Sequence, residues 1–196
     1  MKILKDIIPV SYQNKLENLF DKTDFPWFYN EKIAPSNKKY GDVNITDSPG
    51  YTHVIWNEKE LRSEYFYHVE PILFFLEKET GKTVTDTIRI RARRTTQYPN
   101  HTLNKYNPPH VDLNIDDDYY SLVYYVDDSD GDTVIFEEKY DLDSKSNILY
   151  NGAKQKYRIP PKKGCAVLFD GKHYHSGNTP VNFTKRTIIN FDIKLI

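Results

Sequence analysis

The sequence predicts a mainly β (α+β) fold with flanking helices, a β-sandwich or jelly roll formed by a single domain over residues 1–196. Three observations support this. The 16 Tyr, 10 Phe and 2 Trp are residue types that strands favour. The 11 Pro and 8 Gly supply many turns. Helical periodicity is confined to residues 1–82 and alternating patterns occupy residues 83–196, so we expect helical support packed on the major sheet of a β core.

The first expected helix covers residues 11–20. Ser11 can cap its start, and apolar residues at helical spacing give it one buried face. The aromatic segment at residues 25–29 follows, where Pro26 prevents a continuing helix. We expect this segment to contribute to the core rather than to bind substrate.

The second expected helix covers residues 58–79. Asn57 followed by Glu60 fits a capping box, and Gly81 stands where a helix often ends. Pro71 should kink or split this helix because its ring clashes with the preceding turn.

The β core is expected to contain antiparallel strands separated by turns rich in Asp, Gly and Pro. Residues 137–158 are polar and carry only weak strand signals. The stronger alternating or apolar segments are residues 83–96, 122–126, 133–136, 165–169 and 187–193.

Composition restricts the class of protein. The 27 Lys and Arg balance the 28 Asp and Glu, so no net positive field attracts nucleic acid or anionic lipid. The single cysteine, Cys165, excludes an internal disulfide framework. No apolar run approaches the roughly 20 residues of a membrane span. Lys5 and Asp6 interrupt the apolar N-terminus. We therefore expect a soluble, cytoplasmic protein.

A set of metal-ligating residue types is spread across the predicted strands. His110 and Asp112 stand two residues apart, which on a strand places both on one face. His175 follows several strands later, and Arg186 opens the last strand. Two imidazoles and one carboxylate can bind one face of Fe(II), and an arginine nearby can hold a carboxylate of a second ligand. Taken alone, His110 and Asp112 would be interpreted as a structural pair; the structural alternatives are a turn histidine for His175 and a salt bridge at a strand end for Arg186.

As an ordered set, His110-x-Asp112, His175-x-Gly177 and Arg186 before Thr-Ile-Ile-Asn-Phe-Asp-Ile resemble the Fe(II)/2-oxoglutarate-dependent dioxygenases, prolyl 4-hydroxylase-like branch. The resemblance covers roughly residues 88–193. It implies a double-stranded β-helix (cupin-like jelly roll) that uses Fe(2+), 2-oxoglutarate and O2, with ascorbate as a candidate reductant. It also implies hydroxylation of an unactivated C–H bond, with succinate and CO2 as co-products.

The resemblance assigns roles to individual residues. His110, Asp112 and His175 would bind the metal and form the catalytic centre. Arg186 would bind the C5 carboxylate of 2-oxoglutarate, with Tyr124 as a second donor. The remaining candidates for the cofactor pocket are Tyr98, Tyr106 and Asn190, of which Asn190 shares a strand face with Arg186.

Two assignments have close competitors. Lys185 precedes Arg186, but the apolar alternation of the last strand should turn Arg186 inward. His173 would lie on the same strand face as His175, because the two are two residues apart. We prefer His175 because the small residues Ser176 and Gly177 follow it, as in the family.

The substrate is open to more than one interpretation. The family branch suggests a prolyl or other residue in a protein or peptide, and no membrane partner is expected. Arg89, Arg91 and Arg93 share one strand face, which is typically a solvated face. The same run could instead contact an anionic substrate, including a nucleic acid. A non-catalytic jelly-roll binding module is the third interpretation, and the oligomeric state is not predicted.

Overall fold

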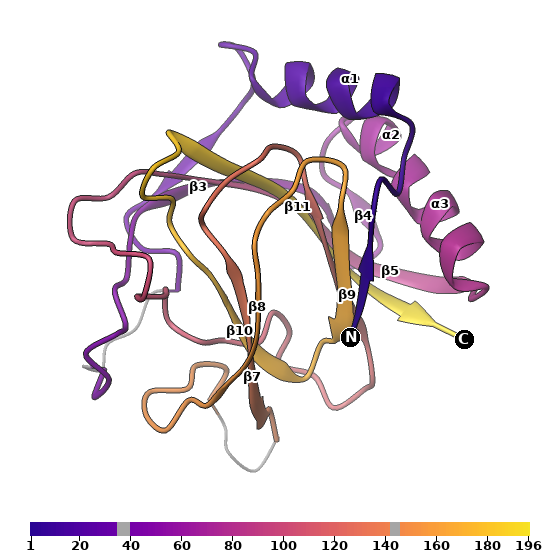
Figure 1. Ribbon diagram of the computed structural model, residues 1–196. Coiled ribbons are helices and arrows are strands. Elements are labelled where there is room, and N and C mark those ends of the chain that lie inside the picture. The colour runs from indigo at the N-terminus through magenta and orange to yellow at the C-terminus, as the bar shows by residue number, and fades with distance from the viewer. Residues whose placement is uncertain (35–39, 142–145) are drawn as a thin grey trace.

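The computed structural model describes residues 1–34, 40–141 and 146–196 and contains two antiparallel sheets flanked by helices (Figure 1). The large sheet has the order β1-β9-β6-β11-β5-β3-β2, with β4 paired to β3. Its strands are β1 (Lys2–Leu4), β2 (Phe28–Asn30), β3 (Gly50–Asn57), β4 (Glu60–Leu61), β5 (Val84–Thr96), β6 (Tyr120–Tyr125), β9 (Ala166–Asp170) and β11 (Lys185–Leu195).

The small sheet has the order β10-β7-β8 and faces the large sheet. Its strands are β7 (Thr133–Lys139), β8 (Gln155–Ile159) and β10 (His173–Gly177). The helices α1 (Val10–Phe20), α2 (Phe66–Val69) and α3 (Pro71–Thr80) cover the other face of the large sheet (Figure 1). None of the described helices is long and apolar enough to cross a membrane.

The two long strands β5 and β11 form the middle of the large sheet and pair along almost their whole length. Side chains alternate between the two faces of each strand. On the helix side, Ile189, Phe191 and Ile193 of β11 join the main hydrophobic core, together with Leu16 of α1 and Leu76 of α3. The apolar face of β11 therefore anchors the helices, as its sequence predicts.

The opposite face of the large sheet forms a second core with the small sheet. This cluster contains Val123 and Tyr125 of β6, Ile135 of β7 and Ile188 of β11. It is smaller than the helix-side core, and it gives way at one end to buried polar and charged side chains. Val123 and Ile188 of this cluster also line a cavity whose other walls are largely polar and charged.

The helical part differs from the sequence prediction at residues 58–65. Glu58 and Lys59 have φ angles of 52° and 65°, and they form the turn between β3 and β4 instead of a helix. Pro71 occupies the first turn of α3, where the missing N–H costs nothing. Gly81 ends α3 in the left-handed conformation with φ 69°, as predicted. Asn57 and Glu60, which fit a capping box in the sequence, instead pair with each other across the turn between β3 and β4.

Residues 1–82 were expected to give only helices and loops, but they also contribute β1, β2, β3 and β4 to the large sheet, and β10 is a further strand that was not predicted. The remaining elements follow the expected pattern with small shifts. The helix at residues 11–20 forms, but it begins at Val10 after Pro9, so Ser11 is not its N-cap. The predicted strands all form, and the weak region at residues 137–158 contains the start of β8. In the segment at residues 25–29, Phe25 is buried whereas Phe28 is 64% exposed, so only part of that segment belongs to the core.

The packing of β11 on the helices makes a stability prediction. Phe191 is fully buried, and Phe191→Ala should lower the free energy of unfolding by about 3–5 kcal/mol through lost burial and a residual cavity. Phe74 on α3 is 62% exposed, and Phe74→Ala should change it by less than about 0.5 kcal/mol. Urea denaturation followed by circular dichroism measures the free energy of unfolding of both variants. If the two variants lose the same free energy of unfolding, this account of the core is wrong.

Candidate active site

A reciprocal backbone pair brings two distant histidines together. The His110 N–H donates to the His175 carbonyl at 2.9 Å, and the His175 N–H donates back to the His110 carbonyl at 2.9 Å. His175 lies on β10, and His110 lies in the segment before β6. The imidazole ring centroids are consequently 4.9 Å apart.

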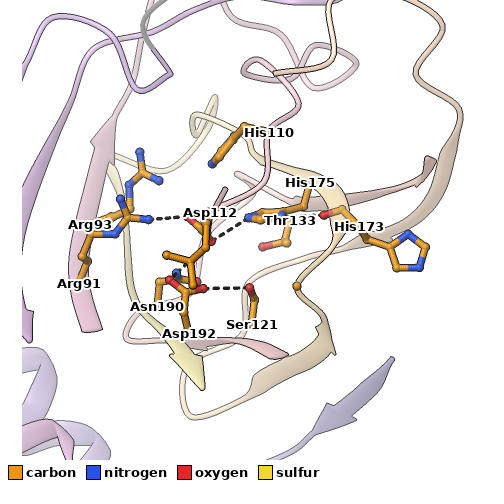
Figure 2. Close-up of polar contacts among 12 residues, drawn as sticks. Arg91, Arg93, His110, Asp112, Ser121, Thr133, His173, His175, Asn190 and Asp192 are labelled. Carbon is orange, nitrogen blue, oxygen red and sulfur yellow. Dashed lines mark hydrogen bonds and ion pairs between the residues drawn. The ribbon is translucent and has the colours of Figure 1, made fainter. Parts of the chain in front are cut away.

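Asp112 completes a cluster with these two histidines (Figure 2). One ligand atom from each of the three residues lies within 4.8 Å of the others, and His175 Nε2 is 3.1 Å from Asp112 Oδ2. Nδ1 of His110 donates to the Pro108 carbonyl at 2.9 Å, and Nδ1 of His175 donates to the His173 carbonyl at 3.1 Å. Because Nδ1 carries the donated proton in each ring, the Nε2 lone pair can bind a metal, which is the usual arrangement for ligating histidines.

The charge states of the cluster also suit a metal. Burial, together with the adjacent His175, lowers the pKa of His110 to about 3. Burial alone would raise the pKa of Asp112, but Arg91, His175 and Arg89 outweigh it and hold that pKa well below its usual range. At neutral pH the His110 imidazole is therefore neutral and the Asp112 carboxylate ionised, which are the forms that bind metals.

The outer oxygen of Asp112 is held by arginines of β5. Arg91 Nη2 makes a short contact with Asp112 Oδ1, and Arg89 Nη2 lies 3.2 Å from the same oxygen. Oδ2 accepts a hydrogen bond of 3.0 Å from the amide of Asn190 on β11. The carboxylate is thus fixed with Oδ2 turned toward His175.

A cavity connects the cluster to Arg186 at the start of β11. Its apolar wall includes Val123 and Ile188. Its other lining residues are Ile33, Arg93, Thr95, His110, Asp112, Thr133, His175, Ser176, Gly177, Arg186 and Asn190.

Arg186 is only 4% exposed, and its charge is not paired with a carboxylate among the described residues. Its Nη2 donates to Thr133 Oγ1 at 2.8 Å, its guanidinium lies 6.0 Å from the Tyr125 ring centroid, and its Nε has no described hydrogen-bond partner. A Cβ atom added at Gly131 would lie 2.8 Å from Arg186 Cδ, and one added at Gly177 would lie 2.9 Å from its Nη1. A buried, unpaired guanidinium of this kind fits an anionic ligand in the cavity.

The structure discriminates between the competing sequence assignments. His175 joins the cluster, whereas the His173 ring points away and contacts the Phe136 carbonyl (Figure 2). Arg186 lines the cavity, whereas Lys185 makes a short contact with Asp21 on the helix side. Asn190 also lines the cavity, although its described contacts are to Asp112 and Asp192.

The three tyrosines lie elsewhere, which corrects their assignment to the cofactor pocket. Tyr124 is fully buried in the helix-side core, because alternation along β6 turns Tyr125 rather than Tyr124 toward Arg186. Tyr106 packs in a separate cluster and its hydroxyl makes a short contact with Asp42. Tyr98 is half-buried in the loop after β5 and is not among the cavity-lining residues.

The arginines of β5 are site residues that the sequence interpretation undervalued. Arg89, Arg91 and Arg93 turn toward the interior, where Arg93 lines the cavity, so the expected solvated face was wrong. The signal was present in the sequence: Ile90 and Ala92 alternate with them and are fully buried on the helix side. An apolar face packed on the helices leaves the arginines on the face that carries Arg186.

No protein-family model and no curated protein sequence matches the chain. Solved structures do match. An oxidoreductase of the 2OG-Fe(II) oxygenase family from Burkholderia pseudomallei has a TM-score of 0.61 and 14% identity, over 97% of this chain and 82% of its own. A Pseudomonas putida prolyl-4-hydroxylase has a TM-score of 0.51 and 12% identity, and the match covers 98% of this chain and 91% of the hydroxylase.

The epimerase SnoN from nogalamycin biosynthesis, in complex with Fe3+, alpha ketoglutarate and nogalamycin RO, gives a TM-score of 0.58 and 8% identity over 97% of this chain and 77% of its own. At these identities the likeness concerns the fold. The chain therefore has the jelly-roll fold of the 2-oxoglutarate/Fe(II) oxygenases, which confirms the fold predicted from its sequence motifs.

Proposed function

We propose that the chain is an Fe(II)- and 2-oxoglutarate-dependent oxygenase. The observation that carries this proposal is one cavity with a His110–Asp112–His175 cluster at one end and an unpaired, buried Arg186 at the other. The fold shared with 2OG-Fe(II) oxygenases supports it. Fe(2+) bound by the cluster would supply the activation of O2 that such chemistry needs, with ascorbate as a candidate reductant.

The chain's own residues would hold and orient these groups. The two Nε2 atoms and Asp112 Oδ2 offer three ligands from one side, leaving the other metal positions open for the co-substrate and O2. Arg186 would bind the distal carboxylate of 2-oxoglutarate through a charge-assisted contact, with the Thr133 hydroxyl beside it. Val123 and Ile188 would cover the carbon chain and exclude water.

For the substrate, we propose hydroxylation of an unactivated C–H bond, with a prolyl or other side chain of a protein or peptide as the first class to test. The fold shared with a prolyl-4-hydroxylase supports this choice. The SnoN complex holds nogalamycin RO, so the same fold also serves a small molecule in that protein. A nucleic-acid substrate loses its main support, because Arg89 and Arg91 turn inward and pair with Asp112 and Asp192.

Anaerobic titration with Fe(II) and 2-oxoglutarate tests the metal cluster. The wild-type protein should develop a chelate charge-transfer band, and His175→Ala should abolish it because one of three ligands is lost. His173→Ala is the matched control, since this ring points away from the cluster, and it should keep the band. A well-folded wild-type protein without the band would contradict the proposal and favour a non-catalytic module. An unchanged band in His175→Ala would instead contradict the assignment of His175 as a metal ligand.

Calorimetric titration of the Fe(II)-loaded protein with 2-oxoglutarate tests the carboxylate anchor. Arg186→Gln should raise the Kd roughly 100-fold, corresponding to about 3 kcal/mol for a buried charge-assisted contact. Lys185→Gln is the matched control, because Lys185 pairs with Asp21 on the other face of β11. If the two variants lose the same affinity for 2-oxoglutarate, Arg186 is not the residue that binds its distal carboxylate.

A further inference from the structure

A second cavity, of about 220 Å³, lies beside the metal cluster. Its distinctive wall is formed by Arg89, Arg91 and Arg93 of β5. Its other lining residues are Ile33, Ala34, His110, Val111, Asp112, Asn147 and Ile148. Four residues line both cavities, namely Ile33, Arg93, His110 and Asp112. The metal cluster therefore stands between an inner cavity that leads to Arg186 and an outer cavity walled by arginines.

The charges around the outer cavity do not balance. Arg89 lies 2.9 Å from Asp192 and 3.2 Å from Asp112, and Arg91 contacts Asp112. Three guanidinium groups thus face two carboxylates. Arg93 has no carboxylate within ion-pair distance among the described residues, and its described hydrogen bond is to the Ile33 carbonyl at 3.2 Å. One positive charge is left over at the junction of the two cavities.

Holding this charge is costly for the empty protein. Burial, together with the neighbouring charge of Arg91, lowers the pKa of Arg93 to about 9, so the guanidinium is disfavoured but still protonated at neutral pH. Buried charges without a partner destabilise a protein unless they serve a ligand. In the proposed function Arg186 binds the distal carboxylate of 2-oxoglutarate, so Arg93, which lines both cavities, is available for another anion.

We propose that Arg93 binds a carboxylate of the substrate that is to be oxidised, seated in the outer cavity beside His110 and Asp112. The inference rests on the proposed oxygenase function and narrows its substrate class. A carboxylate matches the single excess charge, and its two oxygens fit the forked guanidinium. A carboxylate held at Arg93 places the adjoining carbons next to the metal ligands, where a C–H bond would have to lie.

The test uses the Fe(II)-loaded protein saturated with 2-oxoglutarate under anaerobic conditions, so that the inner cavity is filled. Acetate, benzoate and 3-phenylpropionate are each titrated beside the neutral amide of the same acid, by calorimetry and by perturbation of the charge-transfer band. We expect at least one acid to bind roughly tenfold or more tightly than its amide, because only the acid pairs with Arg93. If none of the acids binds more tightly than its amide, the proposal is overturned.

Variants assign the effect to Arg93. Arg93→Gln should remove the preference for the acid while changing the Kd for 2-oxoglutarate less than about threefold, and Arg93→Lys should restore part of the preference. Arg94→Gln is the matched control: Arg94 is the next residue of β5, but it faces away, pairs with Asp21 and stacks 4.8 Å from the Trp27 ring centroid. This variant should behave like the wild type.

The remaining outcomes are also decisive. A loss of 2-oxoglutarate affinity in Arg93→Gln as large as the loss of acid binding would place Arg93 in the co-substrate site and overturn the proposal. Tighter binding of phenyl phosphate than of every acid would overturn the carboxylate assignment. A blocked peptide containing aspartate, compared with its asparagine counterpart, distinguishes an acidic side chain from a free acid as the source. Absence of the charge-transfer band would instead mark failure of the oxygenase proposal itself.

Discussion

The strict alternation of side chains along the paired strands β5 and β11 is the constraint on which the rest of the structure depends. One face of this pair is apolar and packs on the helices, through residues such as Ile90 and Phe191. The other face carries Arg91, Arg186 and Asn190 into the interior. Because the period of a strand is two residues, burying the first face leaves no freedom in placing the second.

The inward face is stable because most of its charges are compensated. Asp192 is fully buried, yet it accepts a hydrogen bond of 3.0 Å from Arg89. It accepts another of 3.1 Å from Ser121 (Figure 2). Burial, and after it the nearby Asp112 carboxylate, raises the pKa of Asp192 to about 6. Among the residues that the structure describes on this face, Arg186 and Arg93 have no carboxylate within ion-pair distance. Each of these two cations lines a cavity beside the cluster, Arg186 the inner one and Arg93 both.

Much of the site could be predicted from sequence because its residues form an ordered set of motifs on alternating strands. Parity alone distinguished Arg186 from Lys185. The same alternation did not identify the right tyrosine of β6. To choose between Tyr124 and Tyr125, one must know which face of β6 meets the inner cavity, and that face is set by the pairing of β6 with β11. Residues 58–65 were misassigned because local capping signals do not reveal that β3 and β4 pair around them.

The two glycines that enclose Arg186 have a consequence beyond packing. With hydrogen atoms in place of side chains at Gly131 and Gly177, the guanidinium sits deep against the backbone, and Tyr125 and Thr133 hold it there. The two imidazoles are held in turn by the His110–His175 backbone pair and by the bonds from their Nδ1 atoms to backbone carbonyls. In the proposed enzyme, the position of the Arg186 anchor relative to the two imidazoles therefore sets the chain length of the dicarboxylic acid that fits best, and a homologue one methylene shorter or longer should bind more weakly.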